Sequence, residues 1–394
     1  MSLHNTYRII GAVLLLVCGS CREEFEIDSV TQGLERSLVV EATITNELKH
    51  QEIRLSRTVA LDATDQEIEN NATVTVVGSD QNSFTFSQNE AGIYVSDIAF
   101  GAQPNTTYSL QVTTANGEKY NSSDEGLSPF VDIDNLYAEL VAGEDGKEKV
   151  QVFVDADGSE SGAKYFRYEY EETYKIVAPF YSDSIATPTS PTGDFSILLS
   201  PKDEQREVCF TTRKSLEFIQ TETTGLEQNI ISRFPIRTIE TDDSIIRTRY
   251  SILARQFTQS IEAFTFYQIL DELGNNEDLL SERQPGSIPG NVESVDSNTS
   301  VIGFFEVASV ASKRIYFDHK DFGIEFVPYF FACDLLTLDS SNSSDWEELR
   351  AKLLSSEYIF FTRDFIGTDW SIANRECGDC TTFSSNTKPD FWED

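Results

Sequence analysis

The chain has 394 residues, of which 39% are hydrophobic and 11% aromatic, so it can bury one large or two smaller cores and is not expected to be disordered. Its formal net charge is −36 at pH 7. A body this acidic repels phosphate backbones and anionic headgroups, which excludes nucleic acid as an expected partner. Divalent cations and basic proteins remain compatible with the charge.

The first 20 residues have the order of an export signal. Arg8 precedes an apolar run over 9–17, and the small residues Gly19 and Ser20 stand directly before Cys21. The run is shorter than the about 20 residues that cross a bilayer as a helix. Small residues before a cysteine are typical of a lipoprotein signal, so we expect cleavage before Cys21 and a membrane anchor formed by lipid on its thiol. An ordinary secretory signal is the alternative.

A short charged run, mostly acidic, follows this cysteine and begins a tether over residues 21–36. Its charged members are Arg22, Glu23, Glu24 and Glu26. The run resembles the signal that sends Bacteroidetes lipoproteins to the outer face of the outer membrane. We therefore expect a lipid-anchored protein of the outer membrane that is exposed on the cell surface; a merely solvated tether is the alternative.

Residues 37–126 predict a succession of short strands without intervening helices. Apolar and polar residues alternate in six runs, at 38–44, 52–57, 72–77, 83–86, 92–95 and 108–112. Turn-forming residues such as those at 103–105 separate the runs. This spacing is typical of an immunoglobulin-like β-sandwich.

Residues 127–394 predict an elaborated fibronectin-III-like β domain. Strands are expected at 133–140, 149–154, 164–170, 208–210 and 247–257, and a strand pair at 300–307 and 313–317. Residues 179–243, rich in Pro, Ser and Thr at first, predict a long insertion. Apolar residues at helical spacing predict short helices near 260–273 and 345–355. The expected fold class is therefore mainly β.

Four cysteines remain once Cys18 leaves with the signal and Cys21 takes the lipid. They are Cys209, Cys333, Cys377 and Cys380. In an exported protein they predict two disulfides, with three possible pairings. The spacing of the last two also occurs in redox and zinc sites, but those need a βα context or a second ligand pair, and the sequence shows neither.

One turn has the oxygen pattern of a cation site. Asp155, Asp157 and Ser159 place side-chain oxygens at alternating positions around Gly158, as calcium loops do. The later bidentate glutamate of an EF-hand is missing. A Ca²⁺ site and a plain β-turn are the two interpretations.

An aromatic-rich stretch offers a possible binding surface. Its tyrosines are Tyr165, Tyr168, Tyr170, Tyr174 and Tyr181. Alternate side chains of a strand face opposite sides, so part of the stretch is expected in the core and the rest could contact a sugar or a protein. Core packing of the whole stretch is the alternative.

Catalytic motifs are scarce. Hydrolases of the serine type need a histidine, and after the signal only His50 and His319 remain, both in polar loop contexts. Metalloprotease and P-loop motifs are absent. We therefore expect no enzyme activity and no cofactor.

Several separated motifs resemble the Bacteroidetes outer-membrane lipoproteins grouped as domain of unknown function 4249. The motifs span 38–47, 53–58, 249–256, 285–291, 301–305 with 313–315, 377–380 and 388–392. The resemblance covers nearly all of the chain after the signal. It implies a gene neighbourhood with TonB-dependent outer-membrane transporters and offers no catalytic residues.

The combined expectation is a non-catalytic surface lipoprotein that helps a TonB-dependent transporter capture its substrate or open. A surface adhesin or glycan-binding lipoprotein that works without a transporter is the alternative, and a secreted hydrolase is a third.

Overall fold

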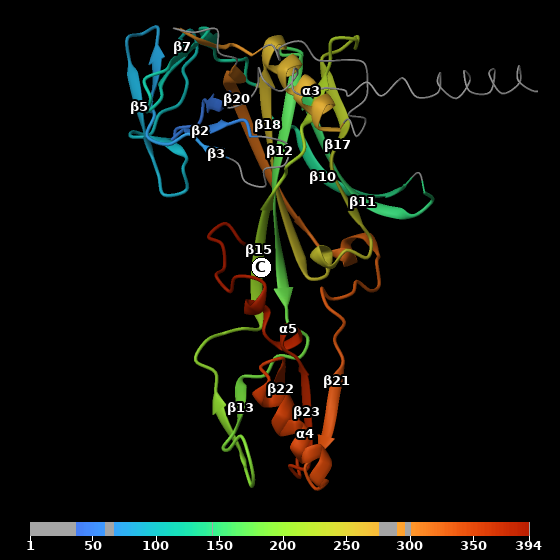
Figure 1. The fold of residues 1–394 in the computed structure, drawn as a ribbon. Helices are drawn as coiled ribbons and strands as arrows, with labels where there is room; N and C mark the ends of the chain where they lie inside the picture. The colour runs from blue at the N-terminus through green and yellow to red at the C-terminus, as the bar shows by residue number, and fades with distance from the viewer. Residues whose placement is uncertain (1–36, 60–66, 144, 276–289, 296–300, 394) are drawn as a thin grey trace, which may run out of the picture.

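The computed structural model describes residues 37–59, 67–143, 145–275, 290–295 and 301–393 (Figure 1). The expected signal and tether, including Cys21, Arg22, Glu23, Glu24 and Glu26, lie outside these residues. The described part is mainly β, which confirms the expected class. No helix in it is long and apolar enough to cross a membrane.

The largest sheet runs through both halves of the chain. In order across it lie β15 (Val208–Lys214), β12 (Tyr165–Val177), β18 (Arg249–Gln259), β20 (Val301–Phe317), β1 (Leu38–Thr45), β2 (Glu52–Arg57), β6 (Tyr94–Ser96), β5 (Ser83–Gln88), β4 (Thr73–Gly78), β7 (Thr107–Thr113), β8 (Lys119–Ser122) and β19 (Val292–Ser294). Three short strands pair beside this path, namely β3 (Glu67–Ile68) on β2, β9 (Glu125–Gly126) on β7 and β16 (Ile219–Glu222) on β12.

Three smaller sheets and the helices complete the described fold. The sheets are β10 (Asn135–Ala142) with β11 (Glu148–Asp157) and β17 (Ile230–Glu240); β13 (Ser184–Pro188) with β14 (Ile197–Pro201); and β21 (Leu335–Asp339), β23 (Asp369–Asn374) and β22 (Tyr358–Arg363). The helices are α3 (Ile261–Asn275), α4 (Ser343–Leu354), α5 (Arg375–Gly378), η1 (Ser244–Ile246), η2 (His319–Phe322) and η3 (Cys380–Thr382).

The molecule is elongated, with a broad upper body and a narrow lower end (Figure 1). We call the lower end the distal lobe; it contains β13, β14, β21, β22, β23 and α4. The lobe has its own small core, in which Leu338, Leu349 and Trp370 are buried. The expected insertion over 179–243 divides between the two parts, because β13 and β14 belong to the lobe and β15, β16 and β17 to the body.

Backbone pairing joins the N-terminal strands to the C-terminal half. β1 pairs in parallel with β20, from Leu38 opposite Val301 to Thr45 opposite Ala308, and antiparallel with β2. β19, which also comes from the second half, pairs with β8. The sheet therefore continues across residue 126, where the sequence predicts a boundary.

The expected strand pair at 300–307 and 313–317 is wrong, because these residues form the single strand β20. The connecting residues 308–312 read Ala-Ser-Val-Ala-Ser and contain no Gly, Pro, Asn or Asp, the residues that favour a turn most strongly. The first half of β20 pairs with β1, and the second half pairs with β18 from Ser309 to Phe317. The single strand β20 thus connects the N-terminal strands, through β1, to the strands of the second half of the chain, through β18.

The helices near 260–273 and 345–355 are confirmed as α3 and α4, and the very short α5 is a third that the sequence pattern does not predict. α3 lies against β20, where Ala263 and Phe266 pack on Phe304. Ile261 and Leu273 are exposed. The first and last of the apolar residues that predict this helix therefore lie outside its buried face.

Candidate functional site

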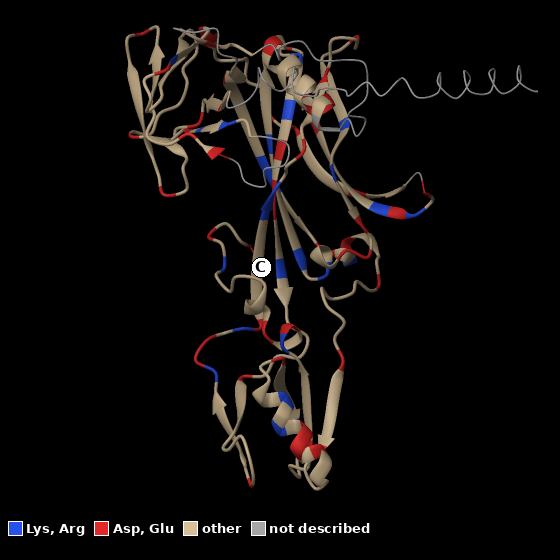
Figure 2. Ribbon diagram, in the orientation of Figure 1, with Lys and Arg blue, Asp and Glu red and all other residues tan. Residues whose placement is uncertain are grey.

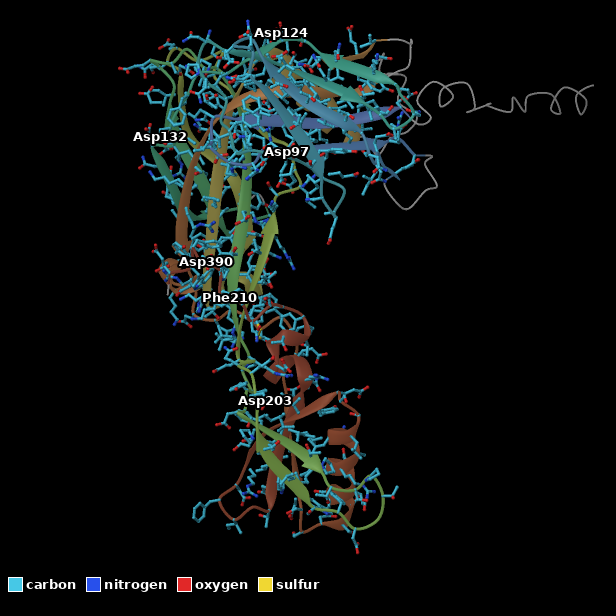
Figure 3. The ribbon with its side chains drawn as sticks, turned by 90° about the vertical axis from the view of Figure 1, so that its left-hand side faces the viewer. Asp97, Asp124, Asp132, Asp203, Phe210 and Asp390 are labelled. Atoms are coloured by element: carbon cyan, nitrogen blue, oxygen red, sulfur yellow. A yellow bond between two sulfur atoms is a disulfide. The ribbon has the colours of Figure 1, made fainter. Side chains whose placement is uncertain are left out.

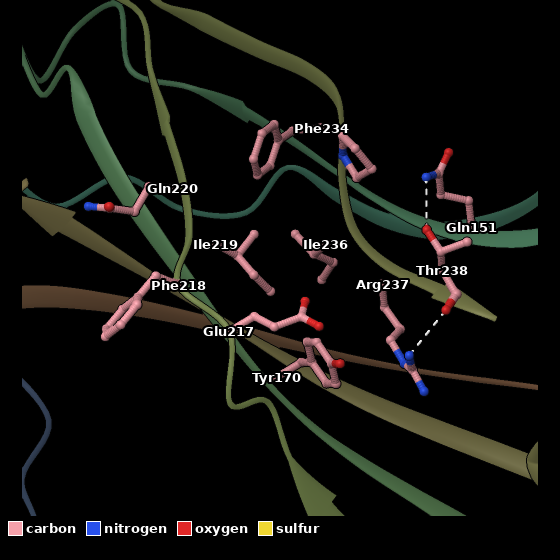
Figure 4. A pocket seen from close by; sticks show the side chains of 11 residues that line it. Gln151, Tyr170, Glu217, Phe218, Ile219, Gln220, Phe234, Ile236, Arg237 and Thr238 are labelled. Carbon is pink, nitrogen blue, oxygen red and sulfur yellow. Dashed lines mark hydrogen bonds between the residues drawn. The ribbon is translucent and has the colours of Figure 1, made fainter. Parts of the chain in front are cut away.

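A groove of about 430 Å³ opens where β17 passes the edge formed by β12 and β16 (Figure 4). Its lining consists of Gln151, Tyr170, Glu217, Phe218, Ile219, Gln220, Phe234, Pro235, Ile236, Arg237 and Thr238. Most of the exposed lining is polar, with aromatic and aliphatic side chains between the polar groups and charged groups at two points. Ring faces and fixed polar groups that meet in a concave surface can together bind a ligand.

A β-bulge in β17 shapes one wall. Val152 of β11 pairs with Arg237 and Phe153 with Pro235, so Ile236 is an extra residue in the ladder. Proline donates no backbone hydrogen bond, which favours such an irregularity at its position. Ile236 is buried, and the side chains of its neighbours turn toward the groove.

A buried carboxylate holds the cation of the groove. Arg237 donates from Nε to Oε2 of Glu172 at 2.9 Å and from a terminal nitrogen to Oε1 at 3.3 Å, and the Tyr250 hydroxyl donates to Oε2 at 2.7 Å. Burial alone would lower the pKa of Arg237, but Glu172 raises it above its usual value. Burial is the main cause that raises the pKa of Tyr250 well above its usual range, and the negative charge of Glu172 raises it further. Arg237 is therefore a permanently charged, fixed group.

The open side of the groove carries exposed apolar residues. Phe218 is 39% exposed and Leu216 is 95% exposed, while Glu217 between them is also exposed. The Phe218 ring packs at 5.6 Å from the ring of Tyr267 on α3. The guanidinium of Arg237 lies 5.7 Å from the ring of Tyr170. The groove thus offers ring faces for stacking beside one fixed positive charge.

The five tyrosines singled out in the sequence do not form one surface. Tyr168 and Tyr174 are buried, at 0% and 2% exposure, as core packing requires. Tyr165 packs on Phe264 at 5.1 Å. Tyr181 lies 4.5 Å from Nζ of Lys202, close to the distal lobe. Only Tyr170 lines the groove.

The oxygens of the candidate calcium turn accept backbone hydrogen bonds. Oδ1 of Asp155 accepts from the backbone N–H of Arg233 at 2.7 Å, and Oδ1 of Asp157 accepts from that of Ser159 at 2.9 Å. Within the described ranges no group of three His, Cys, Asp or Glu side chains could hold a metal ion. Asp157 thus closes the turn, whereas Asp155 holds the neighbouring strand β17.

Both histidines outside the expected signal contact backbone carbonyls. Nδ1 of His50 lies 2.6 Å from the carbonyl oxygen of Ser96, and Nδ1 of His319 lies 2.6 Å from that of Ile324. His319 is also buried. Each ring therefore stabilises a loop.

The two expected disulfides are confirmed, and the structure supplies their pairing. Cys209 bonds to Cys380, and Cys333 bonds to Cys377. The closely spaced Cys377 and Cys380 thus have different partners, so they form a structural staple. They tie the C-terminal segment to β15 and to the strand-free residues before β21.

Sequence reasoning missed Phe218, Phe234 and Arg237. A phenylalanine-proline pair at 234–235 inside an alternating run was the available signal, because proline in a strand marks an edge or a bulge. The partners that complete the groove lie far away along the chain. No local pattern connects them.

Comparison with known sequences places these features in a family. A comparison with curated proteins finds no match. The family model described as "Domain of unknown function (DUF4249)" matches residues 22–314, which include the whole groove and most of the upper body. The cysteine and tryptophan motifs after residue 370 lie beyond the matched range. The chain belongs to the DUF4249 family.

Proposed function

We propose that this protein is a surface lipoprotein of the outer membrane, anchored through Cys21, that captures a ligand for a TonB-dependent transporter without catalysing a reaction. The N-terminal order from Arg8 to Cys21 and the acidic run after it support the anchor and the outward display. The context implied by the family resemblance supports the transporter. Two disulfides are compatible with an oxidising location.

The groove beside β17 is the observation that carries the binding role. Arg237 is held in place by Glu172 and Tyr250, and Tyr170 and Phe218 offer ring faces beside it. Groups that are fixed before the ligand arrives lose little entropy on binding. The proposed ligand is amphipathic, with a flat or apolar part on the rings and an acceptor group near Arg237.

The scarcity of catalytic motifs in the sequence supports a non-catalytic role. We further propose that the body derives from an immunoglobulin-like unit and a fibronectin-III-like unit fused through the β1–β20 pair. The antiparallel N-terminal strands support this interpretation.

Native purification tests the proposal. Tagged protein from its host, crosslinked before extraction, is expected to bring down an outer-membrane barrel transporter. Phe218→Ala is expected to reduce uptake of the transported substrate while keeping this association, because Phe218 is exposed and lines the groove. Leu226→Ala, at an exposed apolar residue outside the groove lining, is the matched control. If repeated crosslinking experiments recover no transporter with the tagged protein, the proposal is contradicted.

Glycan binding without a transporter is the second candidate, favoured by the exposed ring of Phe218 beside Tyr170. Aromatic faces stack on the apolar face of sugars. A glycan array with purified protein would show selective binding that Phe218→Ala removes. Equal adhesion by cells with and without the transporter would favour this candidate.

A further inference from the structure

A second cavity, of about 210 Å³, lies between the distal lobe and the disulfide-tied C-terminal segment. Its lining includes three basic residues, Lys202, Arg206 and Arg375, and apolar residues such as Ile185, Leu353 and Phe360. The loop with Lys202 and Arg206 enters at the narrow neck of the molecule, where Asp203 is labelled in Figure 3.

The cavity has an excess of positive charge in a chain whose net charge is −36. Its lining includes one carboxylate, that of Asp379, which already accepts from Arg206 at 3.0 Å and from the backbone N–H of Thr381 at 3.1 Å. Asp203 on the same loop is exposed. Figure 2 colours Lys and Arg blue. The blue segments of this loop lie beside the distal lobe.

Two donors of this cavity are buried without an acceptor. Nζ of Lys202 and Nε of Arg206 donate no hydrogen bond within the described part of the chain. The ammonium of Lys202 lies 4.5 Å from the ring centre of Tyr181. Burial lowers the pKa of Lys202, and the neighbouring charge of Asp379 only partly opposes this. Buried charged donors without an acceptor are costly, so a bound acceptor would stabilise this arrangement.

We propose that this cavity binds a small organic acid, whose anionic head group lies among Lys202, Arg206 and Arg375 and whose short apolar tail lies against Ile185, Leu353 and Phe360. Arginine and lysine donors suit both carboxylates and phosphate esters. The cavity is small for a ligand site, which restricts the tail to a few carbon atoms. This proposal is independent of the transporter and of the groove beside β17.

Calorimetric titration of the purified mature protein with four probes tests it. Hexanoate and hexyl phosphate each have a tail, and acetate and inorganic phosphate are their tailless counterparts. One tailed probe is expected to bind one to one and about tenfold more tightly than its counterpart, because the tail buries apolar surface. The preferred pair identifies the head group. If no probe binds, the proposal is overturned.

The variant Lys202→Met tests whether Lys202 binds the ligand or only stabilises the fold. The variant is expected to weaken binding about tenfold or more, since it removes a charged donor, and to keep or raise the melting temperature without ligand. Lys164→Met, which changes an exposed lysine elsewhere, is expected to alter neither. Unchanged binding by Lys202→Met, or a lower melting temperature in its ligand-free form, would overturn the proposal. Arg375→Gln provides a second test and is expected to weaken the same probe.

Discussion

The guanidinium of Arg167 lies 3.0 Å from the carboxylate of Glu306, and both side chains are buried. Arg167 is on β12 and Glu306 on β20, so the pair crosses over β18 between them. Glu306 also accepts from Nε2 of Gln259 at 2.7 Å and from the hydroxyl of Thr43 at 3.1 Å. The Tyr267 ring of α3 lies 4.9 Å from the guanidinium. Four strands and a helix thus meet at one buried ion pair, at the point where the N-terminal strands join the rest of the body.

Breaking this pair is expected to destabilise the whole body. Glu306→Leu leaves the charge of Arg167 buried without its main partner, which costs about 3–5 kcal/mol. The double variant Arg167→Met/Glu306→Leu removes both charges and is expected to recover most of that loss. Urea unfolding of the two single variants and the double variant, followed by circular dichroism, measures the coupling. Additive losses would contradict the assigned interaction.

The hydroxyl of Tyr168 is expected to matter for stability rather than for binding. It donates to Oε1 of Gln256 at 2.8 Å, and Nε2 of Gln256 donates to the carbonyl of Val131 at 2.9 Å. Tyr168→Phe leaves a buried acceptor unsatisfied, so the free energy of unfolding should fall by about 1–3 kcal/mol.

Tyr170→Phe is the matched control on the same strand, and it should change stability by less than about 0.5 kcal/mol because Tyr170 is partly exposed. Chemical denaturation compares the two. Equal losses would show that the Gln256 contact does not stabilise the core.

The strand pattern of the sequence predicted the mainly β class and many of the strands, because alternation depends on local residues. It could not predict that β1 pairs with β20, since this contact joins residues more than half the chain apart. For the same reason it placed Tyr168 and Tyr170 in one candidate surface, whereas cover from the other sheet buries only the first. The cysteine count predicted two disulfides, but their pairing depended on where β15 meets η3 and where α5 meets the residues before β21.

Gly303 is expected to be irreplaceable in the β1–β20 pair. A Cβ added to Gly303 would lie 2.6 Å from both Cβ and the carbonyl oxygen of Val40, its partner on β1. A Cβ added to Gly290 would collide with the carbonyl oxygen of Gly303. Gly303→Ala must push two backbones apart, which costs about 1–3 kcal/mol.

Gly126→Ala is the control, because an added Cβ there has nothing closer than 3.9 Å. Thermal unfolding of both variants checks the prediction. A melting temperature of Gly303→Ala equal to that of the control would mean that the two strands lie farther apart.

The carboxylate of Asp379 is expected to give a stabilising contribution that acid removes. Burial alone would raise the pKa of Asp379, but hydrogen bonds from Thr381 and Arg206 bring it below its usual value of 3.8. A group whose folded pKa is lowered stabilises the fold fully above its unfolded pKa and loses this effect as the pH falls through its folded pKa.

Asp379→Asn should therefore be less stable than wild type above pH 3.8, and the difference should shrink as the pH falls below that value. Urea titrations at a series of pH values measure it. Asp203→Asn, a change at an exposed carboxylate, is the control. A difference that stays constant with pH would contradict the role of the charge.

The two disulfides are expected to differ in how strongly they support ligand binding in the basic cavity. Cys209–Cys380 joins residues 171 apart and lies next to the basic cavity, where the backbone carbonyl of Arg206 accepts from the backbone N–H of Cys380 at 3.0 Å. Cys333–Cys377 joins residues 44 apart and holds α5 to the segment before β21.

Removing either disulfide by replacing both of its cysteines with serine should lower the free energy of unfolding by about 2–5 kcal/mol. Loss of Cys209–Cys380 is expected to weaken binding of the tailed acids more, because it frees the segment that contacts Arg206, whereas Cys333–Cys377 holds α5 and with it only Arg375 of the three basic residues. Calorimetry on both variants, at a temperature where each remains folded, distinguishes them; equal weakening by the two variants would place the cavity's support elsewhere.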